Sequence, residues 1–170
     1  TVGDLIATVM EPKQKQCEMN LAEFPKVKTE RELKRLDKWI GFFRNIYKFE
    51  VTGLGNVPQN SNFIISSNHI NNLDPIWLVA AMKGYVPYEN IGCLAAVHLF
   101  KKKVTRKLFE TMGGIPVDRF GNTVPAIARC KECLQGGMNL IIFPEGARSR
   151  DGQMLPFKNG IAKLSIESDT

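Results

Sequence analysis

Long apolar runs are missing from this sequence. Its longest ones, residues 76–82 and 91–97, are far shorter than the roughly 18–20 residues that a bilayer-spanning helix needs. The sequence also shows no basic segment followed by an apolar leader and no N-x-S/T glycosylation acceptor. We therefore expect no membrane-spanning helix and no export, which favours a cytoplasmic location.

Cysteine is also scarce, and its spacing does not favour a metal site. Cys17 and Cys93 stand alone, whereas Cys130 and Cys133 form one C-x-x-C inside a predicted helix. Structural zinc sites commonly combine two such pairs, or one pair with histidines. Neither a second pair nor neighbouring histidines accompany this one. We expect reduced thiols, no metal site and no bound cofactor.

Positive charge predominates, since 23 lysines and arginines against 17 acidic residues give the 170-residue chain a net charge of +6. The excess favours an anionic partner, which is a phosphorylated metabolite, an anionic lipid surface or a nucleic acid. One basic cluster consists of Lys101, Lys102, Lys103, Arg106 and Lys107. It is a solvated helix face, or it contacts anionic lipid, the phosphates of a donor cofactor or an acidic carrier protein. Because no recognition motif accompanies it, we expect no nucleic-acid partner.

From residue 49 onward, short apolar strands alternate with helical patterns. The predicted strands are residues 63–66, 91–95, 115–117 and 140–143, and the predicted helices are 75–83, 99–112 and 124–135. Such alternation indicates an α/β fold with a mostly parallel central sheet flanked by helices. Sites in these folds gather where the strands end in loops.

The first thirty residues differ from the rest. A short apolar piece gives way to a polar run over 11–18, so residues 1–28 are interpreted as a linker. Residues 1–6 resemble the last helix of an acyl carrier protein, which makes a remnant of a preceding domain the alternative. Thr29 and Glu32 then fit a capping box that opens an amphipathic helix. That helix packs on the core or lies on lipid headgroups.

A histidine follows the first predicted strand. His69 precedes Asp74 by five residues, and Asp74-Pro75 is itself typical of a helix start. If the intervening residues fold back, the carboxylate fixes the imidazole tautomer and leaves the other ring nitrogen to take a proton from a hydroxyl. His98, the other histidine, has apolar neighbours and is expected to be packed.

Two further strands each lead to an arginine. Arg119 ends the segment G-G-I-P-V-D-R, and Arg148 lies in F-P-E-G-A-R-S. Guanidinium groups at such loops suit phosphate oxygens. The structural alternative is that Asp118 forms a surface ion pair with either arginine and that Gly146 only makes a turn.

These three segments together resemble the glycerolipid acyltransferases, the glycerol-3-phosphate and 1-acylglycerol-3-phosphate acyltransferase superfamily. The similarity rests on N-H-x4-D from Asn68 to Asp74, on G-x-I-P-V-D-R ending at Arg119, and on F-P-E-G-x-R-S ending at Ser149. It covers about two thirds of the chain, roughly residues 49–162. A similar F-K-x-G segment holds Lys158, which reaches a phosphate or simply precedes a helix.

The resemblance implies a reaction. His69 is the general base and Asp74 orients it, so that an acceptor hydroxyl attacks an acyl-CoA or acyl-carrier-protein thioester directly. The substrate-binding residues carried over are Asn68, Arg119, Glu145, Gly146, Arg148 and Ser149. The implied acceptor is a glycerol-phosphate or lysophospholipid in phospholipid biosynthesis. The implied setting is the inner face of a membrane, with peripheral association.

Three departures from the family pattern bear on the acceptor and on the domain. Pro116 replaces an aromatic or aliphatic residue, and Val97-His98 stands where many members have a lysine. The family's fourth block, an apolar strand with proline, would follow Thr170, so residues 29–170 are expected to be an acyltransferase domain that lacks its C-terminal part. The alternatives are a non-catalytic lipid-binding or carrier-docking module of the same fold, or an acyltransferase for a non-phosphate acceptor.

Overall fold

The computed structural model describes residues 20–170. Cys17, most of the predicted linker 1–28 and the segment similar to a carrier protein therefore lie outside the described residues. No helix within 20–170 is long and apolar enough to cross a bilayer.

A four-stranded parallel sheet forms the centre of the molecule, in the order β1-β4-β2-β3. The strands are β1 (Ile64–Ser66), β2 (Ile91–Ala96), β3 (Gly114–Val117) and β4 (Asn139–Ile142). Each lies within one residue of its predicted position, and the predicted α/β fold is confirmed. The last strand in the chain, β4, is inserted between β1 and β2.

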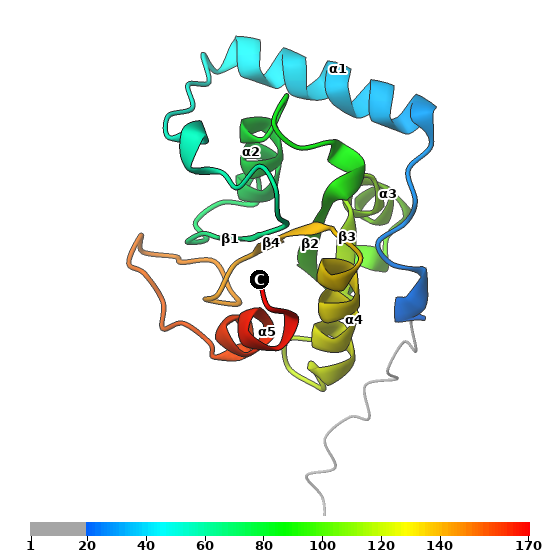
Figure 1. The fold of residues 1–170 in the computed structure, drawn as a ribbon, viewed down its shortest axis with the longest axis vertical. Coiled ribbons are helices and arrows are strands. Elements are labelled where there is room, and N and C mark those ends of the chain that lie inside the picture. Colours follow the sequence, from blue (N-terminus) through cyan, green and yellow to red (C-terminus); the bar gives the residue numbers. More distant parts are fainter. Residues whose placement is uncertain (1–19) are drawn as a thin grey trace, which may run out of the picture.

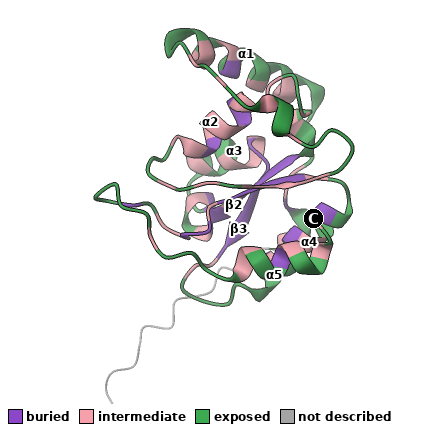
Figure 2. Ribbon diagram, turned by 60° about the vertical axis from the view of Figure 1, so that its left-hand side comes forward, coloured by how far each residue is buried: buried purple, intermediate pink, exposed green. Residues whose placement is uncertain are grey.

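Helices cover both faces of this sheet (Figure 1). One layer holds α1 (Glu30–Ile46), α2 (Asp74–Ala81) and α3 (Lys103–Thr111), and the other holds α4 (Val124–Gln135) and α5 (Gly160–Ser168). Side chains alternate along a strand, so Ile141 of β4 faces the first layer while Leu140 and Ile142 face the second. Figure 2 shows the buried strands lying between the two layers.

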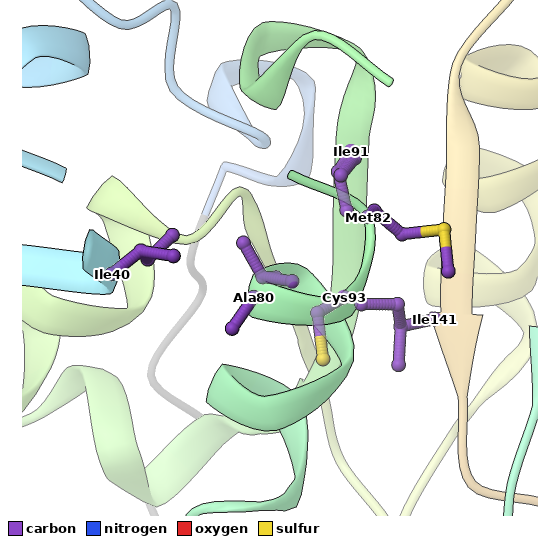
Figure 3. Packing of buried hydrophobic residues seen from close by; sticks show 7 residues of the cluster. Ile40, Ala80, Met82, Ile91, Cys93 and Ile141 are labelled. Carbon is purple, nitrogen blue, oxygen red and sulfur yellow. The ribbon is translucent and has the colours of Figure 1, made fainter. Parts of the chain in front are cut away.

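The core beneath α1 and α2 is built from aliphatic side chains of helices and strands (Figure 3). The labelled members are Ile40, Ala80, Met82, Ile91, Cys93 and Ile141. Ile40 is the one described residue of α1 that is fully buried. The capping box that opens α1 is confirmed, since the Glu32 N–H donates to Thr29 Oγ1 and the Thr29 N–H donates to the Glu32 carboxylate.

The predicted helix over 99–112 is wrong at its start. A 3-10 helix, η5 (Val97–Phe100), comes first, and the α-helix begins only at Lys103 after an extended Lys102. This break lets Phe100 pack edge-on against Phe24, with ring centroids 5.3 Å apart. The same turn directs His98 outward, so the prediction of a packed His98 is also wrong.

The residues just before α1 pack on the domain. Phe24 is almost fully buried, and its carbonyl accepts a hydrogen bond from Arg129 of α4. A short 3-10 helix, η2 (Leu21–Glu23), contacts the same helix. The part of 1–28 that the structure describes, residues 20–28, is thus packed on the same α/β domain.

The three described cysteines, Cys93, Cys130 and Cys133, are buried free thiols. Burial raises the pKa of the Cys93 thiol to about 12 and raises the pKa values of the Cys130 and Cys133 thiols as well. Because the thiolate is the reactive form, the raised pKa values and the burial together make the three thiols poorly reactive in the folded chain.

We therefore predict that a native Cys17→Ser variant reacts negligibly with a thiol reagent. After denaturation the same variant should react at all three remaining thiols of each chain. The Cys17→Ser change restricts the signal to the described thiols. Rapid native labelling at pH 8 would contradict the burial described above.

Candidate active site

All four strands run in the same direction, so their carboxyl ends meet at one edge of the sheet. His69 follows β1, His98 follows β2 and Arg119 follows β3. The segment after β4 carries the Pro-Glu-Gly turn and Arg148. Residues separated by up to 79 positions in the sequence, His69 and Arg148, thus reach one edge of the sheet.

His69 and Asp74 form a hydrogen-bonded pair. The His69 Nδ1 atom lies 2.9 Å from Asp74 Oδ2. The same oxygen accepts the backbone N–H groups of Ile70 and Asn71, each at 2.8 Å. Residues 70–73 therefore fold back, as the catalytic interpretation required. The helix also starts here, but Leu73 occupies the N-cap position, and Asp74 is the first helical residue.

These contacts set the charge of Asp74. Partial burial alone would raise the pKa of its carboxyl. Hydrogen bonds from the Asn71 N–H, the His69 ring and the Ile70 N–H outweigh burial and hold the pKa below its ordinary value. An ionised carboxylate only accepts hydrogen bonds, so Nδ1 carries a proton, and in the neutral imidazole this leaves Nε2 with the lone pair. In the described part of the chain Nε2 has no hydrogen-bond partner.

The segment after β4 makes three contacts with His69. Glu145 Oε1 accepts the His69 backbone N–H at 2.8 Å, and the Ser149 N–H donates to the His69 carbonyl at 2.8 Å. The Phe143 ring stacks on the imidazole, with centroids 4.1 Å apart. Only 17% of the His69 side chain is exposed. The imidazole is therefore fixed before any substrate arrives.

A cavity of about 310 Å³ opens beside His69. This volume lies within the range of ligand sites, roughly 300–1,000 Å³. One wall is apolar and comes from β2, β3, β4, α3, α4 and α5. Its larger side chains are Leu94, Leu99, Phe109, Val117, Ile127, Ile142 and Ile161.

The charged side chains that line the cavity are positive. They are Arg119, Arg148 and Lys158, beside the polar His98, Asn72 and Thr123, and no carboxylate of the described residues lines it. Arg119 Nη1 donates to the carbonyl of Gly146 at 2.8 Å, which fixes the guanidinium at the Pro-Glu-Gly turn. The alternative ion pair of Asp118 is not formed, because its Oδ1 accepts the N–H groups of Phe120 and Gly121 instead.

The predicted substrate residues divide into two groups. Arg119, Gly146 and Arg148 line the cavity together with His69. Asn68, Glu145 and Ser149 do not. Asn68 is exposed, with its carbonyl accepting the Ser67 hydroxyl, whereas Glu145 and Ser149 are buried. Both buried residues bind the His69 backbone, so they position the histidine within the described structure.

His98 and the stacking of Phe143 were missed by the sequence reasoning. No local pattern distinguishes an outward histidine in an apolar run from a packed one. The sequence did contain a signal for Phe143. This residue opens the Phe-Pro-Glu-Gly turn directly after β4, and β4 pairs with β1, the strand that precedes His69. Within residues 20–170, no group of three or more His, Cys, Asp or Glu side chains is arranged to hold a metal ion.

A family model described as Acyltransferase matches residues 48–170. The chain belongs to the acyltransferase family. The resemblance drawn from the three motifs is thereby confirmed. The matched region begins just after α1 and contains the sheet, the His69–Asp74 pair and the cavity.

Individual relatives point to one branch of the acyltransferase family. The chain is 32% identical over 125 residues to a chloroplastic 1-acyl-sn-glycerol-3-phosphate acyltransferase of Brassica napus, covering 72% of this chain and 35% of the relative. It is 33% identical over 125 residues to a 1-acyl-sn-glycerol-3-phosphate acyltransferase of Borreliella burgdorferi, covering 72% and 48%. The chain thus spans less than half the length of these relatives.

A solved structure has the same fold. The 1-acyl-sn-glycerophosphate acyltransferase of Thermotoga maritima aligns with a TM-score of 0.62 at 26% sequence identity. The alignment covers 85% of this chain and 59% of the other.

The Glu145 contacts give a prediction about stability. Glu145→Ala removes the acceptor of two partly buried N–H groups, those of His69 and Leu155. We expect it to lower the free energy of unfolding by about 1–2 kcal/mol for each bond. Glu145→Gln retains one carbonyl oxygen and should lose less.

Urea denaturation measures this difference. Ser149→Ala is the matched control, because the backbone N–H that binds His69 remains and only the hydroxyl contact with Asp151 is lost. If Glu145→Ala is as stable as Ser149→Ala, the carboxylate does not hold the two segments together.

Proposed function

We propose that this chain transfers a fatty acyl group from a thioester to the hydroxyl of a glycerol-phosphate or lysophospholipid acceptor. The observation that carries this is a histidine paired with an ionised aspartate, whose second ring nitrogen is free beside a cationic and apolar cavity. The acyltransferase relatives, named for 1-acyl-sn-glycerol-3-phosphate, support the same acceptor class.

His69 acts as general base in this proposal. Its Nε2 takes the proton of the acceptor hydroxyl while the oxygen attacks the thioester carbonyl. The tetrahedral intermediate then collapses, the carbon–sulfur bond breaks, and the imidazolium returns the proton to the leaving thiolate. Asp74 stabilises the imidazolium through the Nδ1–H bond.

Direct transfer needs no covalent acyl-enzyme. Among the described residues that line the cavity there is no serine or cysteine. Ser67 binds backbone groups with both its N–H and its hydroxyl and does not line the cavity. A path through a serine ester or a cysteine thioester on the enzyme therefore has no support from the residues that line the cavity.

The two parts of the cavity match the two parts of the substrates. The cations Arg119 and Arg148 suit a phosphate, which arginine binds in bidentate fashion. The apolar wall suits an acyl chain, because burying methylene groups there is favourable. The donor is an acyl-CoA or an acyl-carrier protein, and either brings its thioester to the same imidazole.

The test of the chemistry is His69→Ala. We predict a fall in the turnover number of about 10²–10⁴-fold, the usual contribution of a general base. Transfer is measured with a labelled acyl-CoA or acyl-carrier protein and lysophosphatidate, alongside the unfolding temperature. Lys163→Ala is the control, since that side chain is exposed on α5 and does not line the cavity.

Equal turnover in His69→Ala would refute the base role. Thioester consumption that needs no acceptor would point to hydrolysis, and no consumption at all would favour the non-catalytic lipid-binding or carrier-docking module. A preference for acceptors without phosphate would favour the remaining alternative.

Membrane association is the second part of the proposal. On α1, Trp39 is 62% exposed and Phe42 is 57% exposed, and their rings meet edge-on. Exposed lysines and arginines lie on the same helix, including Lys34, Arg35 and Lys38, which suits anionic headgroups. We propose peripheral binding to the inner face of a membrane through this helix.

We predict that a Trp39→Ser/Phe42→Ser variant binds anionic vesicles at least about tenfold more weakly, because each buried apolar side chain contributes roughly 1.5–3 kcal/mol. Vesicle co-sedimentation measures this. Ile166→Ser is the control, since Ile166 is 81% exposed on α5 in the opposite layer. Unchanged binding in the double variant would exclude α1 as the membrane contact.

A further inference from the structure

Lys158 lies over the Pro-Glu-Gly turn. Gly146 has a positive φ of 67°, and a Cβ atom placed on it would lie 2.9 Å from both Cε and Nζ of Lys158. The lysine side chain therefore occupies the space that any other residue at 146 would fill. The backbone of Lys158 is tied to the same turn, because its N–H donates to the Pro144 carbonyl at 2.9 Å.

Arg119 reaches the same glycine through its carbonyl oxygen, at 2.8 Å from Nη1. With standard bond lengths, Nη1 of Arg119 and Nζ of Lys158 each lie within about 5 Å of the Gly146 Cα. Both residues also line the cavity beside His69. Two cations from different segments thus converge on one glycine.

Neither cation has an acidic partner among the described residues. The neighbouring lysine of α5 differs, since Lys163 lies 3.7 Å from Glu167. By the same bounds the two nitrogens lie within about 10 Å of each other, so the unpaired positive charges repel one another, and an anion bound between them offsets that repulsion. The simple alternative, that Lys158 only precedes a helix, accounts for its backbone but not for where its ammonium group lies.

We propose that Lys158 determines acceptor specificity by binding the acceptor's phosphate jointly with Arg119. This rests on the proposed function, whose acceptor carries a phosphate beside the reacting hydroxyl. Arg119 supplies a fixed planar donor, and the flexible lysine supplies a second charge that adapts to the phosphate. The absence of a side chain at Gly146 makes room for that ammonium group.

The first test measures binding without chemistry. Glycerol 3-phosphate and glycerol are titrated by calorimetry against the full chain, Lys158→Ala, Lys158→Arg and the control Lys163→Ala. We expect Lys158→Ala to weaken glycerol 3-phosphate binding by about 10- to 100-fold, as for a hydrogen bond to a charged group. Lys158→Arg should restore most of the affinity, Lys163→Ala should bind like the unaltered chain, and glycerol should bind weakly to all.

A double-mutant cycle tests the geometry. A Cβ on residue 146 meets the Lys158 ammonium group, so Gly146→Ala should weaken glycerol 3-phosphate binding with the lysine still present. Because both changes act on one group, the loss in the double variant should be clearly smaller than the product of the single losses. Independent losses that multiply would overturn the role of Gly146 in placing the lysine.

Kinetics then separates this role from a general structural one. With lysophosphatidate as acceptor, Lys158→Ala should raise KM about tenfold or more, and with monoacylglycerol it should leave KM unchanged. An equal effect on both acceptors, or none, would overturn the specificity role. If the unaltered chain transfers no acyl group, the proposed function fails, while the calorimetric comparison still decides whether Lys158 binds phosphate.

Discussion

One oxygen atom of Asp74 organises the site. It accepts three hydrogen bonds, from the His69 ring and from two successive backbone N–H groups, all at 2.8–2.9 Å. On a continuous helix, side chains five positions apart point about 140° away from each other. The fold-back of residues 70–73 is therefore necessary for the pair. Through it, the direction of the imidazole follows from the start of α2.

Local patterns account for most of what the sequence predicted. Alternation along strands and helical spacing are local properties, and they located every strand within one residue and α4 over Val124–Gln135. The predicted start of the helix at residue 99 was wrong, because Phe100 packs against Phe24, which is distant in the sequence, and α3 begins only at Lys103. Such a contact leaves no trace in the sequence around Phe100.

For the candidate site, the sequence likewise predicted which residues gather there but not which atoms they contact. Three motifs identified His69, Asp74 and the two arginines, because each motif sits at a strand end and parallel strands bring those ends together. What the motifs do not encode is the partner of each side chain. Glu145 faces the backbone of His69 from 76 residues away, and His98 faces the cavity because η5 turns it outward.

The cavity beside His69 combines an apolar wall with positively charged side chains. Apolar side chains of both layers form one wall, while Arg119, bonded to the Gly146 carbonyl, lies on the other side with Arg148 and Lys158. A molecule with a hydrocarbon part and an anionic part satisfies both at once. The relatives from Brassica napus and Borreliella burgdorferi are named for 1-acyl-sn-glycerol-3-phosphate, a molecule of that kind.

The position of β4 between β1 and β2 has a consequence for how the chain folds during translation. In the described sheet β1 pairs only with β4, and the paired residues Ile64 and Leu140 are 76 positions apart. A nascent chain on the ribosome therefore exposes an unpaired β1, and an open side of β2, until β4 emerges. His69 has its ring partner five residues away, but Phe143, Glu145 and Ser149 follow 74–80 residues later, so partly translated chains carry unpaired strand edges that favour aggregation.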